Sequence, residues 1–278
     1  MQCGIEKAVI PAAGLGSRML PITRSIPKEM LPVGRKPMVQ HVVEEAAASG
    51  LKQICIVIRE GKKVIREYFD FKTSPGKSRE AVAELEALVA DCELTFVFQE
   101  HQAGLGDALL QARDFVGTES FVMMIPDQLM FGSTPAASQL LNHWRPGAAI
   151  WSSLVRLPKQ ERSLFAGARG VEYQEIDNGE VAISRLRTED ETMAAHQDLN
   201  YEVRGFGRTI FPPEIFDYLG PSFADPRTGE VDLLKTFEKC TEELKVFGIW
   251  LDGEPFDLGT FRSYYHFLPR FSNQYVVG

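Results

Sequence analysis

The chain has 278 residues and a formal net charge of -8, from 30 Lys plus Arg against 38 Asp plus Glu. This acidic balance argues against nucleic acid or a membrane surface as a partner. Hydrophobic residues make up 44% of the chain and charged residues 24%, which is the composition of an ordinary globular protein and excludes a disordered one.

The first half of the chain alternates between short apolar runs and amphipathic stretches. The apolar runs predict buried strands at 7–13, 53–58, 94–99 and 121–127. The amphipathic stretches predict helices at 37–49, 62–69, 81–89 and 104–115. Strands and helices that alternate at this spacing predict a mostly parallel sheet with helices on both faces.

The second half of the chain is less regular and richer in β-structure. Strands are predicted near 148–157, 168–176, 180–186, 203–211 and 245–251. Helices are predicted near 213–219 and 231–243 and from about residue 260, and the polar, acidic stretch 187–200 predicts a surface loop. Because no linker, repeat or low-complexity tract separates the two halves, we expect one α/β domain over residues 1–278 with a β-rich C-terminal elaboration.

The cysteines and the N-terminus indicate the compartment. The four cysteines are too far apart for a C-x-x-C metal site and predict reduced thiols; they are Cys3, Cys55, Cys92 and Cys240. The N-terminus has no long apolar segment behind a basic start, and no apolar run approaches the roughly 18 residues of a membrane span. We therefore expect a cytoplasmic protein.

A basic segment follows the first predicted strand. Residues 14–37 contain five cations and one acid, a charge of 5 minus 1, or +4: Arg18, Arg24, Lys28, Arg35 and Lys36 against Glu29. Three prolines before Lys36, at positions 21, 27 and 32, exclude a continuous helix, so we expect an ordered loop. A stiff cationic loop at the carboxyl end of a parallel strand suits a polyphosphate, although the charge alone fits a solvated surface loop equally well.

The amino-acid sequence of this loop resembles a known motif. G-L-G-S-R-M-L-P-I-T-R-S-I-P-K-E-M-L-P is similar to the G-x-G-[ST]-R-x-x-P-x-T-x-x-x-P-K-x-[ML]-L-P segment of sugar-1-phosphate nucleotidylyltransferases. P-K-E-M-L-P-V is most like the bacterial UTP-glucose-1-phosphate uridylyltransferases within that family. Further family motifs resemble three later segments, in the same order: F-Q-E-H-Q-A-G-L-G-D-A-L at 98–109, I-P-D at 125–127 and F-D-L-G-T at 256–260.

The resemblance implies both a fold and an activity. The fold would be a Rossmann-like sheet of the nucleotide-diphospho-sugar transferase type, with a nucleotide-binding half at about 1–145 and a sugar-phosphate-binding half at about 146–278. The activity would be Mg²⁺-dependent transfer of a nucleotidyl group from UTP to a sugar 1-phosphate, most simply glucose 1-phosphate. Such in-line transfer needs positioning and charge neutralisation more than a protein nucleophile. By the same analogy, we expect a homo-oligomer.

The resemblance also assigns roles to individual residues. The base and ribose would lie against the backbone of Ala12, Ala13 and Gly14. The β- and γ-phosphates would be held by Gly16, Ser17 and Arg18. Lys28 would neutralise charge at the α-phosphate and, with Arg18, would be catalytic.

Two aspartates and a glutamine complete the implied site. Asp127 and Asp257 would bind Mg²⁺, which prefers hard oxygen ligands. Gln99 would read the uracil edge through its amide, and Gly104 would let the base lie close. Without the resemblance, each aspartate fits a turn or cap residue and Gln99 an ordinary strand terminus.

One family motif is missing from the second half. The uridylyltransferases carry V-E-K-P, whose lysine holds the sugar phosphate, whereas alignment on D-N-G-E-V at 177–181 places I-S-R-L-R at 183–187 here. Arg185 or Arg187 could supply the missing cation, because a guanidinium binds phosphate through two hydrogen bonds. The departure leaves two alternatives open: an enzyme that uses dTTP or a different sugar 1-phosphate, and a non-catalytic paralogue that regulates a partner enzyme.

Overall fold

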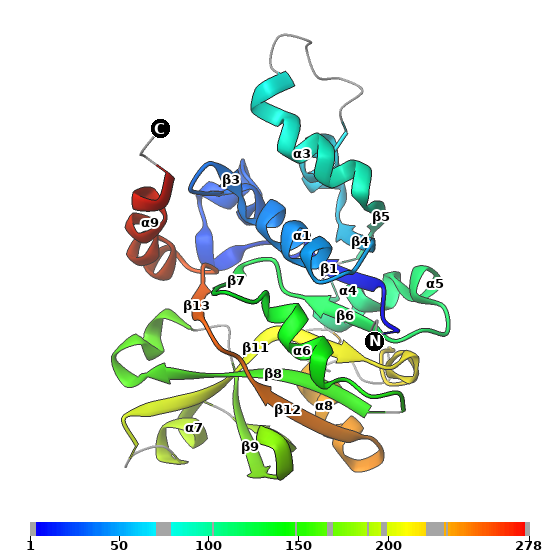
Figure 1. The fold of residues 1–278 in the computed structure, drawn as a ribbon, viewed down its shortest axis with the longest axis vertical. Helices are drawn as coiled ribbons and strands as arrows, with labels where there is room; N and C mark the ends of the chain where they lie inside the picture. The colour runs from blue at the N-terminus through cyan, green and yellow to red at the C-terminus, as the bar shows by residue number, and fades with distance from the viewer. Residues whose placement is uncertain are drawn as a thin grey trace.

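One large sheet runs through the molecule, shown as a ribbon in Figure 1. The computed structural model describes residues 4–70, 79–101, 103–147, 149–165, 169–187, 189–195, 199–220, 231 and 233–275. The sheet has nine strands, which in spatial order are β5 (Glu93–Phe98), β4 (Gln53–Ile58), β1 (Lys7–Pro11), β6 (Phe121–Met124), β11 (Tyr201–Phe211), β8 (Ala149–Pro158), β12 (Lys245–Trp250), β10 (Glu180–Arg187) and β9 (Gly170–Glu175).

The sheet is mixed but mostly parallel. Strands β5, β4, β1 and β6 pair in parallel, and so do β8 and β12. Strand β11 is antiparallel to β6 and β8, and β10 is antiparallel to β12 and β9. Because β11 and β10 run against the other seven of the nine strands, most carboxyl ends meet at one edge of the sheet, as the alternating sequence pattern predicts.

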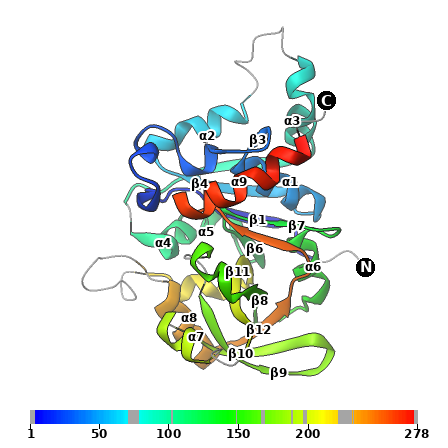
Figure 2. The ribbon, with the colours of Figure 1, turned by 90° about the vertical axis from the view of Figure 1, so that its left-hand side faces the viewer.

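Two apolar layers cover the two faces of the sheet. In β1, Ala8 and Ile10 belong to one layer and Val9 to the other, because successive side chains of a strand point to opposite faces. The first layer packs against α1 (Met38–Ala48), α2 (Lys63–Tyr68), α3 (Arg79–Asp91), α6 (Ala136–His143) and α9 (Phe261–Tyr275). The second packs against α4 (Gly104–Gln111), α5 (Arg113–Val116) and α8 (Leu233–Glu243). Figure 2 shows α1 and α4 on opposite sides of β1.

The basic loop after β1 has no continuous helix, as its prolines predict. It forms short 3-10 turns and a small hairpin: η1 (Ser17–Met19), η2 (Ile22–Arg24), η3 (Lys28–Met30), β2 (Pro32–Val33) and β3 (Lys36–Pro37). Other 3-10 segments are η4 (Glu60–Lys62), η6 (Lys159–Leu164), η7 (Asp177–Gly179) and η8 (Pro213–Asp217). The last of these occupies most of the segment for which the sequence predicts a helix at 213–219.

The prediction of a surface loop over 187–200 is wrong in its centre. Residues Glu189–Ala195 form a helix, α7, whose Thr192 is fully buried; residues 188 and 196–198 of that stretch lie outside the described ranges. A Cβ atom on Gly170 of β9 would lie only 1.9 Å from the Thr192 hydroxyl oxygen, so the helix packs directly on the strand. The Glu, Met and Ala residues of this segment favour a helix, a local signal that its polar, acidic composition outweighed in the prediction, and packing on β9 buries one side of it.

A second small sheet is absent from the sequence predictions. Strands β7 (Gln128–Phe131) and β13 (Glu254–Asp257) pair antiparallel, with Gln128 opposite Asp257. The pairing joins two chain segments that lie more than a hundred residues apart. It brings the end of β13 beside the turn that follows β6.

The three described cysteines are free thiols, as the sequence predicts. Cys55 and Cys240 are buried and Cys92 is half-buried, all three as free thiols, while Cys3 lies outside the described residues. Burial raises the pKa of Cys55 and of Cys240 to about 12, which makes both thiols unreactive. Within the described residues, each helix is too short or too polar to cross a membrane.

Candidate active site

A cleft of about 740 Å³ opens at the carboxyl ends of the parallel strands. Strand β1 ends at Pro11, β5 at Phe98 and β6 at Met124, and each is followed directly by residues that line the cleft. The residues expected from the sequence that line it are Ala13, Gly14, Ser17, Arg18, Lys28, Gln99, Gly104, Asp127 and Asp257. The fold thus brings together residues that come from four separate motifs.

Two of the expected backbone positions lie just behind the cleft wall. Ala12 is fully buried, and its carbonyl oxygen accepts a hydrogen bond from Lys62 Nζ at 2.8 Å. Gly16 has a φ of 68°, a left-handed conformation that favours glycine, and its carbonyl accepts a hydrogen bond from the Thr23 hydroxyl at 2.9 Å. Both residues therefore shape the loop from behind the described cleft lining.

The two arginines expected at the sugar phosphate stand apart from the cleft lining that the structure describes. Arg185 Nε donates to Glu172 Oε2 at 2.9 Å, and Arg185 Nη1 donates to Glu191 Oε1 at 3.0 Å. Arg187 Nη2 lies 3.7 Å from the same Glu172 carboxylate. Leu186, between them, lines the cleft instead.

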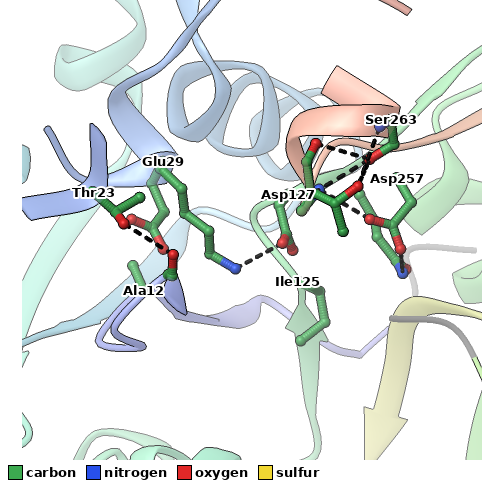
Figure 3. Close-up of polar contacts among 12 residues, drawn as sticks. Ala12, Thr23, Glu29, Ile125, Asp127, Asp257 and Ser263 are labelled. Atoms are coloured by element: carbon green, nitrogen blue, oxygen red, sulfur yellow. Dashed lines mark hydrogen bonds and ion pairs between the residues drawn. The ribbon is translucent and has the colours of Figure 1, made fainter. Parts of the chain in front are cut away.

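Lys28 and Asp127 form an ion pair inside the cleft. Lys28 Nζ lies 2.7 Å from Asp127 Oδ2, the contact that a dashed line marks at Asp127 in Figure 3. Burial acts to lower the pKa of Lys28, but the negative charges of Asp127 and Glu29 outweigh it and raise that pKa. Burial likewise acts to raise the pKa of Asp127, but the Lys28 charge outweighs it and lowers that pKa. Both side chains are therefore charged at neutral pH.

Asp257 shares the site with Asp127. Its Oδ1 accepts a hydrogen bond from the Gly259 amide at 3.0 Å, and its Oδ2 accepts one from Gln128 Nε2 at 3.2 Å. Burial, followed by the negative charge of Asp127, raises the pKa of Asp257 to about 6. A Cβ atom at Gly259 would lie 2.5 Å from Asp127 Oδ2 and 3.1 Å from Arg18 Nη2, so only glycine fits between these groups.

The carboxylate pair suits a divalent cation. Each carboxyl is almost fully buried, and the raised pKa of Asp257 shows that a second negative charge is unfavourable there without a counterion. Among the described residues, no group of three or more His, Cys, Asp or Glu side chains could hold a metal alone. Mg²⁺ commonly uses one or two carboxylates and completes its shell with substrate phosphates and water, so these two residues fit it.

A buried ion pair fixes the basic loop to the end of β1. Lys62 Nζ donates to Glu29 Oε2 at 2.7 Å and to the Ala12 carbonyl at 2.8 Å, and both charged side chains are almost fully buried. Burial lowers the pKa of Lys62, although the negative charge of Glu29 opposes that shift. Because Glu29 directly follows Lys28, this pair positions the lysine that faces the cleft. The sequence does not predict this ion pair, because Lys62 begins a stretch that is typical of a polar surface helix.

Arg208 of β11 fixes the turn that carries Asp127. Its side chain is fully buried and forms a bidentate pair with Glu45 of α1, at 2.8 and 2.7 Å. The same guanidinium donates to the carbonyl oxygens of Ile125 and Gln128, each at 3.0 Å, on either side of Asp127. One arginine thereby ties a helix, a strand and the turn that carries Asp127 together.

Gln99 is held in one orientation. Its Nε2 donates to the Gly104 carbonyl at 3.0 Å and to Asp107 Oδ2 at 2.7 Å. These two acceptors fix which end of the amide is nitrogen. The carbonyl end of Gln99 is then available to accept a hydrogen bond from a ligand, for example from the N–H of a base.

The structure adds one cation that the sequence reasoning missed. Arg169, which precedes β9, lines the cleft together with Arg18 and Lys28. In the sequence, Arg169 is marked only by its position next to Gly170 at the start of a predicted strand, which does not indicate a role in binding.

Comparison with known proteins places the chain in a family. The sequence model of the family described as Nucleotidyl transferase matches residues 7–273. UTP--glucose-1-phosphate uridylyltransferase 1 of Staphylococcus saprophyticus is 33% identical over 265 residues, covering 92% of this chain and 88% of that protein. UTP--glucose-1-phosphate uridylyltransferase 2 of Streptococcus pyogenes serotype M1 is 34% identical over 267 residues, covering 92% of this chain and 86% of that protein.

Solved structures agree with this placement. A UDP-glucose pyrophosphorylase complexed with UDP-glucose has a TM-score of 0.82 and 26% identity, over 97% of this chain and 99% of that one. A UTP-bound UGPase from Acinetobacter baumannii has a TM-score of 0.78 and 26% identity, over 97% of this chain and 94% of that one. From its motifs, its cleft and these relatives, the chain belongs to the nucleotidyl transferase family.

Proposed function

We propose that the chain transfers a uridylyl group from UTP to glucose 1-phosphate, giving UDP-glucose and pyrophosphate. The observation that carries the proposal is the grouping of Arg18, Lys28, Asp127 and Asp257 in one cleft, with Lys28 Nζ at 2.7 Å from Asp127. These groups supply the positive charge and the metal-binding oxygens that phosphate chemistry needs. The relatives at 33% and 34% identity, which bear the name UTP--glucose-1-phosphate uridylyltransferase, support the choice of substrates.

The reaction is an in-line displacement at phosphorus. A phosphate oxygen of glucose 1-phosphate forms a bond to the α-phosphorus of UTP, and the bond from that phosphorus to the bridging oxygen breaks. The electron pair leaves with pyrophosphate. Lys28 neutralises charge on the α-phosphate, while Arg18 and the backbone at Ser17 hold the β- and γ-phosphates.

The remaining site residues bind and orient the nucleotide. Asp127 and Asp257 hold Mg²⁺, which supplies further charge neutralisation at the phosphates when it is bound. Gln99 accepts a hydrogen bond from the uracil N–H, and Gly104 leaves room for the base. The backbone at Ala13 and Gly14 faces the base and ribose, and Ala12 supports it from behind. A cytoplasmic location and a homo-oligomeric state are part of this proposal by family analogy alone.

Two alternatives make different predictions for substrate use. Use of dTTP requires room for the methyl group of thymine. A putative glucose-1-phosphate thymidylyltransferase from Bacillus anthracis shares the fold, with a TM-score of 0.67 and 20% identity. A regulatory paralogue without activity would have no need to keep the cations and carboxylates of the cleft together. We favour uridylyl transfer because both the charged site and the 33% to 34% identical relatives support it.

The test is a pyrophosphate-release assay with purified protein and Mg²⁺. UTP, dTTP and CTP are each paired with glucose 1-phosphate, galactose 1-phosphate and N-acetylglucosamine 1-phosphate. We expect the highest kcat/KM for UTP with glucose 1-phosphate. A marked preference for dTTP would overturn the uridylyl assignment, and no turnover with any pair would overturn the enzymatic one.

A further inference from the structure

The cleft has an uneven distribution of cations. Residues from the first half contribute Arg18 and Lys28, both in the basic loop. The cleft-lining residues described in the second half are mostly glycines and apolar side chains, with Arg169 as their one cation. The V-E-K-P lysine, which this chain lacks, would lie in the second half. Arg169, rather than Arg185 or Arg187, is the cation from that half that lines the described cleft.

The guanidinium of Arg169 is available to a ligand. Within the described ranges its side chain forms no ion pair or hydrogen bond, and the residue is exposed. Arg185, by contrast, is paired with two glutamates, and Arg208 is fully buried against Glu45. An exposed, unpaired cation that lines a cleft can bind an anion without first breaking an internal ion pair.

The backbone around Arg169 is held firmly. Its carbonyl oxygen accepts a hydrogen bond from the Gly205 amide of β11 at 2.7 Å. The next residue, Gly170, pairs with Arg204 of β11 and packs against Thr192 of α7, where a Cβ atom would have no space. The sheet and the helix therefore fix the point from which the arginine side chain extends.

We propose that Arg169 binds the phosphate of the sugar 1-phosphate acceptor. This inference rests on the proposed nucleotidyl transfer. The acceptor phosphate must approach a triphosphate of the same sign of charge, and a further cation in the cleft offsets that repulsion. A guanidinium suits the task because its planar donors can form two parallel hydrogen bonds to phosphate oxygens. Arg18 and Lys28 then serve the triphosphate, and Arg169 serves the acceptor.

The kinetic test compares two arginine variants. Arg169→Gln should raise the KM for glucose 1-phosphate roughly 10- to 100-fold, the usual effect of losing a charged hydrogen-bonding partner. The KM for UTP should stay within about twofold, because Arg18 and Lys28 are the cations assigned to UTP. Arg169→Lys should fall in between. Arg185→Gln is the matched control, since it removes a guanidinium from the neighbouring strand outside the cleft lining, and it should behave as the unaltered protein does.

A binding measurement separates this inference from the proposed function. Glucose 1-phosphate is titrated calorimetrically into the protein saturated with α,β-methylene-UTP and Mg²⁺, a mixture that cannot react. Weaker binding to Arg169→Gln, with unchanged binding to Arg185→Gln and unchanged melting temperatures, supports the inference even if no turnover is ever observed. Equal affinity for Arg169→Gln and the unaltered protein, or no binding to either, overturns it, and an active enzyme in that case leaves the proposed function standing.

Discussion

Lys28 keeps its positive charge in a setting where burial alone would favour the neutral amine. The Asp127 and Glu29 carboxylates raise its pKa, so it stays protonated through neutral pH and loses its proton only at more alkaline pH than an ordinary lysine. The ammonium is therefore present before any substrate arrives. A compact cation on a flexible stem can then move from Asp127 to a phosphate oxygen without a change of protonation.

Replacement of Lys28 by alanine should lower kcat by at least about 10²-fold, because the charge that develops at the α-phosphate loses its partner. Arg24→Ala is the matched control: it removes an exposed cation from the same loop at a position outside the described cleft lining, and it should leave kcat near its original value. The check is pyrophosphate release, with thermal melting to show that both variants fold. Near-normal turnover in Lys28→Ala would contradict the role assigned to this residue.

At the scale of elements, the site depends on how the turn between β6 and β7 is held. Arg208 joins Glu45 of α1 to the carbonyls that flank Asp127, at 3.0 Å from each. The pairing of β7 with β13 then brings Asp257 beside that turn. The two metal-binding candidates thus come together through a buried arginine of the main sheet and a short antiparallel ladder outside it.

Arg208→Met should destabilise the protein by about 3–5 kcal/mol, the usual cost of leaving one member of a buried ion pair without its partner. The double variant Arg208→Met with Glu45→Gln should recover part of that stability, because the buried carboxylate is then gone. Chemical denaturation gives the free energies of unfolding. Activity should stay low in the double variant, since the carbonyls beside Asp127 still lack their donor. A return of full activity together with stability would show that Arg208 does not position the turn.

Regular elements could be predicted from the sequence, and contacts between distant segments could not. The strands at Lys7–Pro11 and Gln53–Ile58 are continuous apolar runs, which is the local signal of a buried parallel strand. The pairing of β7 with β13 depends on a partner more than a hundred residues away and has no local signal. Helix α7 is rich in the helix formers Glu, Met and Ala, but the contact of Thr192 with Gly170, which buries one side of it, has no signal in the sequence.

The site shows the same division between local and distant information. The motifs that follow β1, β5 and β6 are contiguous in sequence, and their residues line one cleft. Arg185 and Arg187 alternate with Leu186 along β10, so they occupy one face and Leu186 the other. The sequence shows that alternation but does not show which face meets the cleft, and the structure gives that face to Leu186. Arg169, just before β9, is the cation from the second half that lines the cleft among the described residues.

For the whole molecule, the distribution of charge matters more than its total. Residues 14–36 carry +4, so the rest of the chain carries -8 minus 4, or -12. Of the loop's five cations, Arg18 and Lys28 line the cleft, as does Arg169, and the carboxylates that line it with them are Glu29, Asp127 and Asp257. A net charge of -8 would repel UTP, whereas Arg18, Lys28 and Arg169 would attract it once Mg²⁺ offsets the charges of Asp127 and Asp257. Screening lengths of about 10 Å at 0.1 M salt mean that the nearer charges should dominate.

Added salt distinguishes these two fields by the sign of its effect on UTP binding. If the total charge governed binding, NaCl would screen a repulsion and UTP would bind more tightly. If the cleft governs it, NaCl screens an attraction, and we expect the Kd for UTP to rise several-fold between about 50 and 500 mM NaCl at fixed Mg²⁺. Uridine, which has no phosphate, is the control ligand and should show little change. Calorimetric titration of both ligands measures the effect, and tighter UTP binding at high salt would show that the acidic surface, not the basic loop, sets the field at the site.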